Sequence, residues 1–219
     1  MPDIKGRQCS YNQAHVTDFR NSTIDQAKRQ FASYTSGNKD AIRPSLRSVV
    51  FRINVKYGSK GDYDAIRHEF SQTTSIDGKE VCLRSLGTAP TAELAKDLLH
   101  FMFSDEVAVQ DLHFGAVSLA VNTIGRKALW NFIVEDWDKV WAKMSSRPIV
   151  MARFVKNTLS EFSTSGMEET MDQFFKDKDQ SGWDRAVTQA MDAVRTKAKY
   201  RERDEQLLLE WVKVHGYAR

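Results

Sequence analysis

The sequence has few residues of the kinds that mark several protein classes. It contains only two cysteines, Cys9 and Cys82, far apart in the chain. Two distant cysteines fit a reducing compartment better than a disulfide framework, although a single bridge stays open. No apolar run approaches the roughly 20 residues that span a bilayer, and the opening residues MPDIKGRQCSYNQAH contain no apolar segment of a signal peptide. We therefore expect a cytoplasmic protein with no membrane association.

A strong excess of one charge is also absent. Lys and Arg number 32 against 29 Asp and Glu, which gives a net charge of +3. Because this mild excess forms no basic stripe, we do not expect a nucleic-acid partner. Prolines number only 4, apolar residues make up 41% and charged residues 28% of the chain. That composition is typical of soluble helical proteins and excludes disordered and collagen-like chains.

The stretch from Ser85 to Trp141 gives the clearest structural signal, three helices with two short joints. The joints fall near Ser104-Asp105 and at 122–125. The first and third helices have apolar residues at helical spacing. These residues are Leu94, Leu98, Phe101 and Met102 in the first helix, and Leu129, Phe132, Ile133, Trp137, Val140 and Trp141 in the third. The middle helix, about 107–121, is apolar on almost all sides, so we expect it to be buried between the other two.

Helix signals continue through the rest of the chain. We predict helices over 22–34, 44–57, 62–72, 76–86, 149–162, 167–175 and 183–214. Ser22 is the expected N-cap of the earliest helix, and Pro44 is the expected first residue of the next, whose predicted stripe is Val49, Val50, Ile53 and Tyr57. Gly87 is the expected left-handed end of the helix before it. The charged run 197–205 predicts a break or a solvent-facing turn.

These elements define the predicted fold and its domains. Residues 1–20 are polar and lack periodicity, so we expect a poorly ordered segment there and a helical domain over 21–219. Helix pairs recur about every 35 to 45 residues, the spacing of HEAT-like and armadillo-like repeats. The sequence therefore predicts an all-α protein, an α-solenoid of about ten antiparallel helices. Its leading helix pair has no polar capping repeat in front of it.

Catalytic motifs are missing. The chain has five histidines, but none forms the His-Glu-x-x-His spacing that places two metal ligands on one helical face. His68-Glu69 begins that pattern, and Gln72 stands where its second histidine belongs. No Cys-x-x-Cys, nucleophile elbow, phosphate loop or dinucleotide fingerprint occurs. We therefore expect no metal site, no cofactor and no enzymatic activity in this chain.

Four polar residues stand out in otherwise apolar surroundings. Gln110 and Asp111 lie within the apolar middle helix, and we interpret them first as a hydrogen-bonded structural pair between repeats. Arg153 interrupts an apolar helix between Met151 and Phe154. It is either an ion-pair residue or a cation on a concave face that holds a ligand carboxylate. Together with Arg126, these residues are the candidates for polar groups on a concave surface.

The phrases LRSLGTAPTAELAKDLLHFMFSDEVAVQD and NTIGRKALWNFIVEDWDKV resemble a known family. They are similar to the C-terminal helical domain of M1-family zinc aminopeptidases, also called the endoplasmic-reticulum-aminopeptidase-like C-terminal domain. The likeness is greatest to the puromycin-sensitive and fungal types. It runs from about Thr23 to Tyr217, and the first 20 or so residues do not share it.

The resemblance implies a HEAT-like solenoid that closes a peptide chamber over a separate catalytic domain. Zinc and the catalytic motifs of the family, His-Glu-x-x-His and Gly-x-Met-Glu-Asn, would belong to that domain, and this sequence contains neither. The implied partners are the catalytic domain and peptide substrates. The alternative is a free-standing helical-repeat adaptor whose concave face binds another protein.

Overall fold

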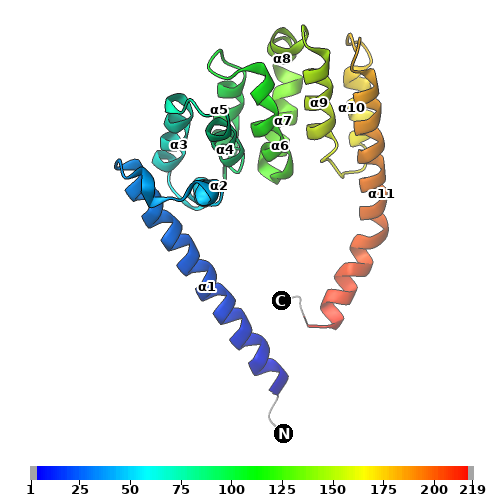
Figure 1. Cartoon of the computed structure of the whole chain (residues 1–219). Coiled ribbons are helices and arrows are strands. Elements are labelled where there is room, and N and C mark those ends of the chain that lie inside the picture. Colours follow the sequence, from blue (N-terminus) through cyan, green and yellow to red (C-terminus); the bar gives the residue numbers. More distant parts are fainter. Residues whose placement is uncertain (1–3, 217–219) are drawn as a thin grey trace. The chain divides into compact units, whose positions relative to one another are not determined.

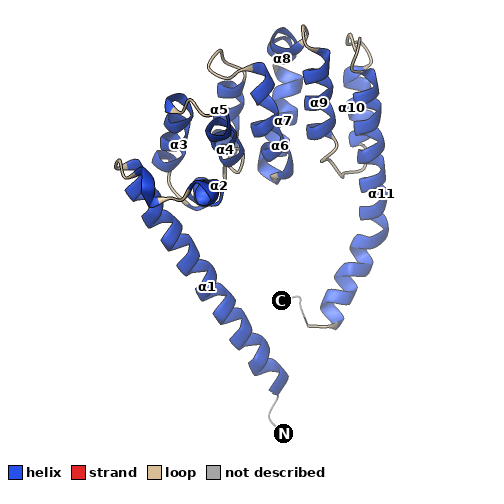
Figure 2. Cartoon of the chain, in the orientation of Figure 1, coloured by secondary structure: helices blue, strands red, loops and turns tan. Residues whose placement is uncertain are grey.

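The computed structural model describes the backbone of residues 4–216 and the side chains of residues 18–216. Every regular element in that part of the chain is a helix, as predicted, and the fold class is all-α and solenoid-like (Figures 1 and 2). The described helices include none with the length and apolarity needed to cross a bilayer. The chain divides at Pro90 into two compact units, which are described separately.

The described part of the N-terminal unit, residues 4–90, consists of four α-helices and two short 3-10 helices. They are α1 (Ile4–Thr35), η1 (Lys39–Ala41), η2 (Pro44–Leu46), α2 (Arg47–Tyr57), α3 (Lys60–Gln72) and α4 (Ile76–Leu86). Helix α2 packs against α1, α3 and α4. Phe51 of α2 contacts Phe31 and Tyr34 of α1 edge to face, each at a ring-centroid distance of 5.5 Å. Tyr63, Ile66 and Phe70 form the buried face of α3, as predicted.

Local signals explain where several of these helices begin and end. Pro44 is the first residue of its helical segment, as predicted, since its missing N–H needs no partner there. Ser59 and Asp62 form a capping box at the start of α3. Gly37 ends α1 with a φ of 113°, a conformation that favours glycine.

Three predictions for this unit are wrong. Ser22 is no N-cap, because α1 already begins at Ile4, and the Ser22 hydroxyl donates to the Phe19 carbonyl inside the helix. The expectation that residues 1–20 lie outside the packed fold stays a prediction. Gly87 ends α4 in a right-handed conformation, with a φ of −65°, where a left-handed one was expected.

The third error concerns the apolar face of α2. The buried residues are Val50, Phe51, Asn54 and Val55, whereas Val49 of the predicted stripe is 54% exposed. The face is rotated because Asn54 is buried and donates hydrogen bonds to the carbonyls of Ala27 and Val50. A pattern that counts only apolar residues does not register a buried asparagine whose hydrogen bonds are made inside the core.

Between residues 91 and 216, the C-terminal unit contains seven α-helices and one 3-10 helix. They are α5 (Ala92–Met102), η3 (Val109–Asp111), α6 (Leu112–Val121), α7 (Thr123–Glu135), α8 (Trp137–Met144), α9 (Pro148–Leu159), α10 (Met167–Phe175) and α11 (Asp184–Val214). Helix α6 packs against α5, α7 and α9, which confirms that the apolar middle helix is covered by its neighbours. Helix α11 in turn packs against α9 and α10, and Figure 1 shows these three side by side.

Two predictions for this unit are corrected. The single helix expected through Trp141 divides at Asp136, whose φ of −117° and ψ of 34° are not helical. The division places the Trp137 ring 5.5 Å from Phe174 and 5.8 Å from Phe175. Helix α11 runs unbroken through the charged segment 197–205, where a break was one of two expectations. Its charges are satisfied on the surface by pairs such as Arg201 with Glu205, 2.8 Å apart and one turn along the helix.

Candidate functional site

The potential metal ligands among the described side chains are dispersed. Within residues 18–216, no three His, Cys, Asp or Glu side chains lie close enough together to hold a metal ion. Two of the described histidines have local partners of another kind. His113 Nδ1 lies 2.7 Å from the Gln110 carbonyl, and the His215 ring stacks on Trp211 at 4.3 Å. This donor set does not fit a zinc site.

Cys82 of α4 does not have the character of a nucleophile. Its side chain is buried, and burial, with the nearby Glu69 carboxylate, raises the pKa of the thiol to about 12. The reactive form of cysteine is the thiolate, so this thiol is inert at neutral pH.

Glu69 of α3 is the centre of a polar cluster beside that thiol. Its carboxylate accepts hydrogen bonds of 2.6 Å from the Tyr34 hydroxyl and 2.6 Å from the Lys39 ammonium. Burial works against ionisation of Glu69, but these two hydrogen bonds outweigh it, and the pKa of the carboxyl is lowered. The Arg47 guanidinium lies over the Tyr34 ring at 5.5 Å. This cluster joins η1 and α2 to the α1–α3 interface and was not predicted.

Gln110 and Asp111 lie in η3, directly before α6. Gln110 is exposed, so the predicted buried pair is not what the structure shows. Its side-chain oxygen accepts a hydrogen bond of 3.3 Å from Arg147, which precedes α9. This exposed hydrogen bond joins Gln110 to the residue before α9, and the structural role of Gln110 and Asp111 stays a prediction.

Arg126 has a structural position at the α6–α7 joint. Its Nε donates a hydrogen bond of 2.6 Å to the carbonyl of Ala120, in the last turn of α6. Its guanidinium also lies 5.9 Å from the centre of the Phe162 ring. These contacts satisfy a carbonyl at a helix end, as a cation there is expected to do.

Arg153 lines a groove on the described part of the C-terminal unit. The groove lies between α9 and the start of α11 and has a volume of about 500 Å³. Its lining residues are Ile149, Ala152, Arg153, Lys156, Asn157, Gly182, Trp183, Arg185, Ala186 and Gln189. Gln110, Asp111 and Arg126 are not among them. The structure therefore gathers Arg153 with Lys156 and Arg185, which sequence reasoning did not single out.

The missed cations had only part of a signal in the sequence. Arg153 and Lys156 are three residues apart on a predicted helix, a spacing that puts both on one face. Arg185 is 29 residues beyond Lys156, and it joins them because α11 packs along α9. That pairing of helices is tertiary information.

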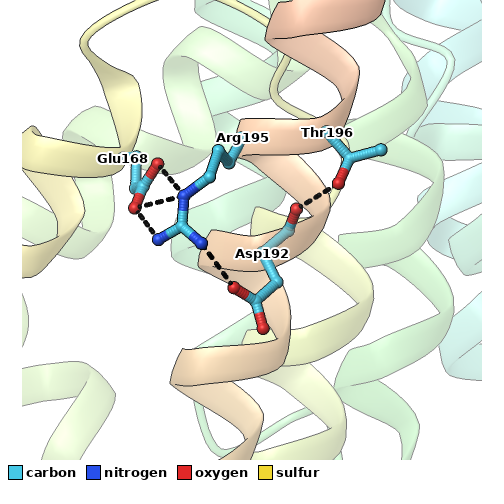
Figure 3. A network of polar contacts seen from close by, with 4 residues as sticks. All are labelled: Glu168, Asp192, Arg195 and Thr196. Carbon is cyan, nitrogen blue, oxygen red and sulfur yellow. Dashed lines mark hydrogen bonds and ion pairs between the residues drawn. The ribbon is translucent and has the colours of Figure 1, made fainter.

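A polar network fixes the first half of α11 to α10 (Figure 3). Arg195 forms a two-point ion pair with Glu168 and a 2.9 Å hydrogen bond with Asp192, and Thr196 donates to the Asp192 carbonyl. The hydrogen bond from Arg195 lowers the pKa of the Glu168 carboxyl. The same pair raises the pKa of Arg195. The network is exposed and has the character of a structural tie.

The second half of α11 presents an apolar surface to solvent. Its exposed large side chains are Tyr200, Leu207, Leu208, Leu209, Trp211 and Val214. Several of them line a pocket of about 980 Å³ along the helix. Tyr200, Leu207, Trp211 and Val214 are spaced so that they share one side of the helix, and a large exposed apolar patch marks an interaction site.

The chain is similar to one domain family and to aminopeptidases that contain it. The family model of the ERAP1-like C-terminal domain matches residues 8–196. The match begins before Thr23, so the expectation that the first 20 or so residues differ from the family is wrong from residue 8 onward. Aminopeptidase 2 of Candida albicans is 27% identical over 194 residues, which cover 88% of this chain and 21% of that protein.

Other relatives are also aminopeptidases. The mitochondrial Aminopeptidase 2 of Saccharomyces cerevisiae is 26% identical, covering 90% of this chain and 21% of its own length. Human Aminopeptidase N is 22% identical, covering 80% of this chain and 18% of its own. The chain thus spans about a fifth of the length of the relatives it matches.

Proposed function

Since the chain belongs to the family of ERAP1-like C-terminal domains, we propose that it is the non-catalytic helical domain of an M1 zinc aminopeptidase. In this proposal the domain closes the peptide-binding chamber over a catalytic domain that is not part of this sequence. The family match over residues 8–196 is the observation that carries the proposal.

The chain covers only part of the length of its relatives, which supports separate roles for this helical domain and a catalytic domain. The relatives are named as aminopeptidases, and the chain matches 18–21% of the length of those described above. The sequence contains neither His-Glu-x-x-His nor Gly-x-Met-Glu-Asn. Since the donors among residues 18–216 also do not fit zinc, we propose that the metal and the peptide-cleaving groups are supplied by the catalytic domain, in cis or in trans.

The apolar face of α11 supports docking onto another domain. Leu207 and Leu208 are 63% and 62% exposed, and Trp211 is 52% exposed. At about 25 cal/mol per Å² of apolar surface removed from water, covering such side chains favours association. We propose that this face packs against the remainder of the aminopeptidase. The cytoplasmic location and the assignment of 21–219 as the helical-repeat domain are part of the same proposal.

A segment replacement tests the proposed function. In Candida albicans Aminopeptidase 2, the 194-residue segment that matches this chain is deleted or exchanged for this chain. Hydrolysis of a single-residue amide and of peptides of increasing length is measured for both proteins and for the parent. The deletion should lose the parent's dependence on peptide length, and the exchange should restore a length dependence.

Two further results complete that test. Leu207→Ser with Leu208→Ser in the exchanged protein should lower its thermal stability, whereas Val49→Ser, at an exposed position of α2, should not. If the deletion variant and the exchanged protein are both well folded and hydrolyse peptides of all lengths at equal rates, the chamber-closing role is wrong. The adaptor alternative would then gain support.

A further inference from the structure

The groove between α9 and α11 concentrates positive charge. Arg153 and Lys156 enter it from α9, and Arg185 enters it from α11. The lining contains no carboxylate. Among the described residues, none of these three cations forms an ion pair or a side-chain hydrogen bond.

That arrangement is electrostatically unfavourable without a ligand. Three like charges in one groove repel one another, and water and salt screen this repulsion only in part. Several other cations on α11 are paired, as Arg195 is with Glu168 and Arg201 with Glu205. The groove is therefore a local positive field on a chain whose net charge is only +3.

The groove also has an apolar part. Trp183 is 3% exposed and lies among the lining residues with Ala152 and Ala186, and Ile149 is 78% exposed. Ala152 of α9 and Ala186 of α11 contribute small side chains to the lining. Its volume of about 500 Å³ falls in the range of about 300–1,000 Å³ that is usual for ligand sites.

The combination of three cations and an apolar part favours one class of anionic ligand over others. An inorganic anion would use the three cations but leave Ile149 and the apolar side chains without a contact. A nucleic-acid strand needs a basic track along its backbone, and this groove holds three cations in one place. A peptide that alternates carboxylates with an apolar side chain uses both parts. Asn157 and Gln189 supply donors and acceptors for its backbone.

We propose that this groove binds an acidic peptide segment. Arg153 and Arg185 hold its carboxylates through two-point hydrogen bonds, which the guanidinium fork suits. Lys156 acts as a third, less directional positive charge. An apolar side chain of the segment packs between Ile149 and Trp183. The proposal concerns this chain by itself and does not depend on the chamber-closing role.

The test uses the full chain and a fluorescein-labelled peptide, acetyl-Glu-Glu-Leu-Glu-Glu-amide, whose fluorescence anisotropy reports binding. Binding should be measurable at low salt and should weaken at least about tenfold at 0.5 M NaCl, because the Debye length falls from about 10 Å at 0.1 M to about 3 Å at 1 M. The variant with Arg153→Gln and Arg185→Gln should weaken binding by a factor of about 10 or more. Arg52→Gln with Lys127→Gln removes the same charge at exposed sites outside the groove and should leave the affinity within about twofold.

Further arms separate the possible ligands. The Gln-for-Glu peptide should not bind, and inorganic phosphate should compete only weakly. Ile149→Ser should weaken peptide binding without changing phosphate competition. Because the groove cations have no partners, their Gln variants should unfold at the same temperature as the unchanged chain or higher. Equal affinity of the groove variant and the charge-matched control, equal binding of the neutral peptide, or no binding at low salt would each overturn the proposal.

Discussion

Arg195 of α11 forms a two-point ion pair with Glu168 of α10, with its Nε 2.8 Å from one carboxylate oxygen and 2.9 Å from the other. The contact joins residues 27 positions apart and lies beside the buried residues of α11, among them Val187, Ala190 and Val194. This half of α11 is thus fixed by packing and by charge. The second half continues as a helix with an exposed apolar face.

The first prediction concerns the pH dependence of that pair. The pKa of Glu168 is lowered in the folded chain by Arg195, so the pair stabilises the fold above the unfolded pKa of Glu, about 4.3. This contribution is lost as the pH falls through the lower, folded pKa. Glu168→Gln should therefore lower the melting temperature at pH 7 and have a smaller effect in strong acid. Glu169→Gln, the exposed neighbour, should show no such pH-dependent difference.

The second prediction concerns Tyr34. Its side chain is 2% exposed and its hydroxyl donates to Glu69 at 2.6 Å. Tyr34→Phe keeps the ring contact with Phe51 but removes that hydrogen bond, which should cost about 1 kcal/mol of unfolding free energy. Tyr200→Phe, at a position 62% exposed, should change it by less than about 0.5 kcal/mol. Urea unfolding of both variants measures the difference, and equal midpoints would contradict it.

The third prediction concerns the close approach of α6 and α7. A Cβ on Gly125 would lie 2.8 Å from the backbone oxygen of Leu119 and 3.0 Å from its Cα. Backbone cannot move aside cheaply, so Gly125→Ala should destabilise the chain by about 1–3 kcal/mol. In Gly61→Ala the nearest atom is the Ser59 hydroxyl at 3.4 Å, and this change should be neutral or stabilise by about 0.5 kcal/mol. The melting temperature should fall for Gly125→Ala, and it should rise or stay unchanged for Gly61→Ala.

The fourth prediction ranks three tryptophans by burial. Trp183 is 3% exposed, Trp137 is partly buried and Trp211 is 52% exposed. Trp183→Ala should cost about 3–5 kcal/mol, as for a buried aromatic, and Trp137→Ala should cost less. Trp211→Ala should have the smallest effect on the isolated chain. Trp137 and Trp183 both contact the Phe175 ring. A different order of unfolding free energies in urea would contradict the burial assigned to these tryptophans.

The helices of this chain were predictable because their signals are local. Pro44 marks the start of its helical segment through its own backbone preference, and α4 and α10 have the predicted bounds. The errors have different causes. Asn54 is buried where its amide donates to the Ala27 carbonyl of another helix, which is tertiary information. Asp136 interrupts a helix through a backbone conformation that an apolar pattern does not register. Gly87 ends its helix without the left-handed conformation that glycine permits.

For the candidate polar residues, the sequence identifies single positions but not the residues that they meet in the fold. Arg153 was found because it interrupts an apolar pattern within one helix. Lys156 and Arg185 become its neighbours only through the packing of α11 on α9. Gln110 was noticed for the same reason as Arg153, but its partner Arg147 could not be chosen from sequence, since it belongs to another element.

The central claim is that this chain is the non-catalytic domain of an aminopeptidase. The most direct measurement is the intact mass and peptide map of the native gene product, purified under denaturing conditions with an antibody against residues 91–216. The account predicts a polypeptide several times heavier than the 25.0 kDa of this sequence, with a His-Glu-x-x-His segment upstream. A native product of 25.0 kDa that never co-purifies with an aminopeptidase catalytic domain under native conditions would contradict it.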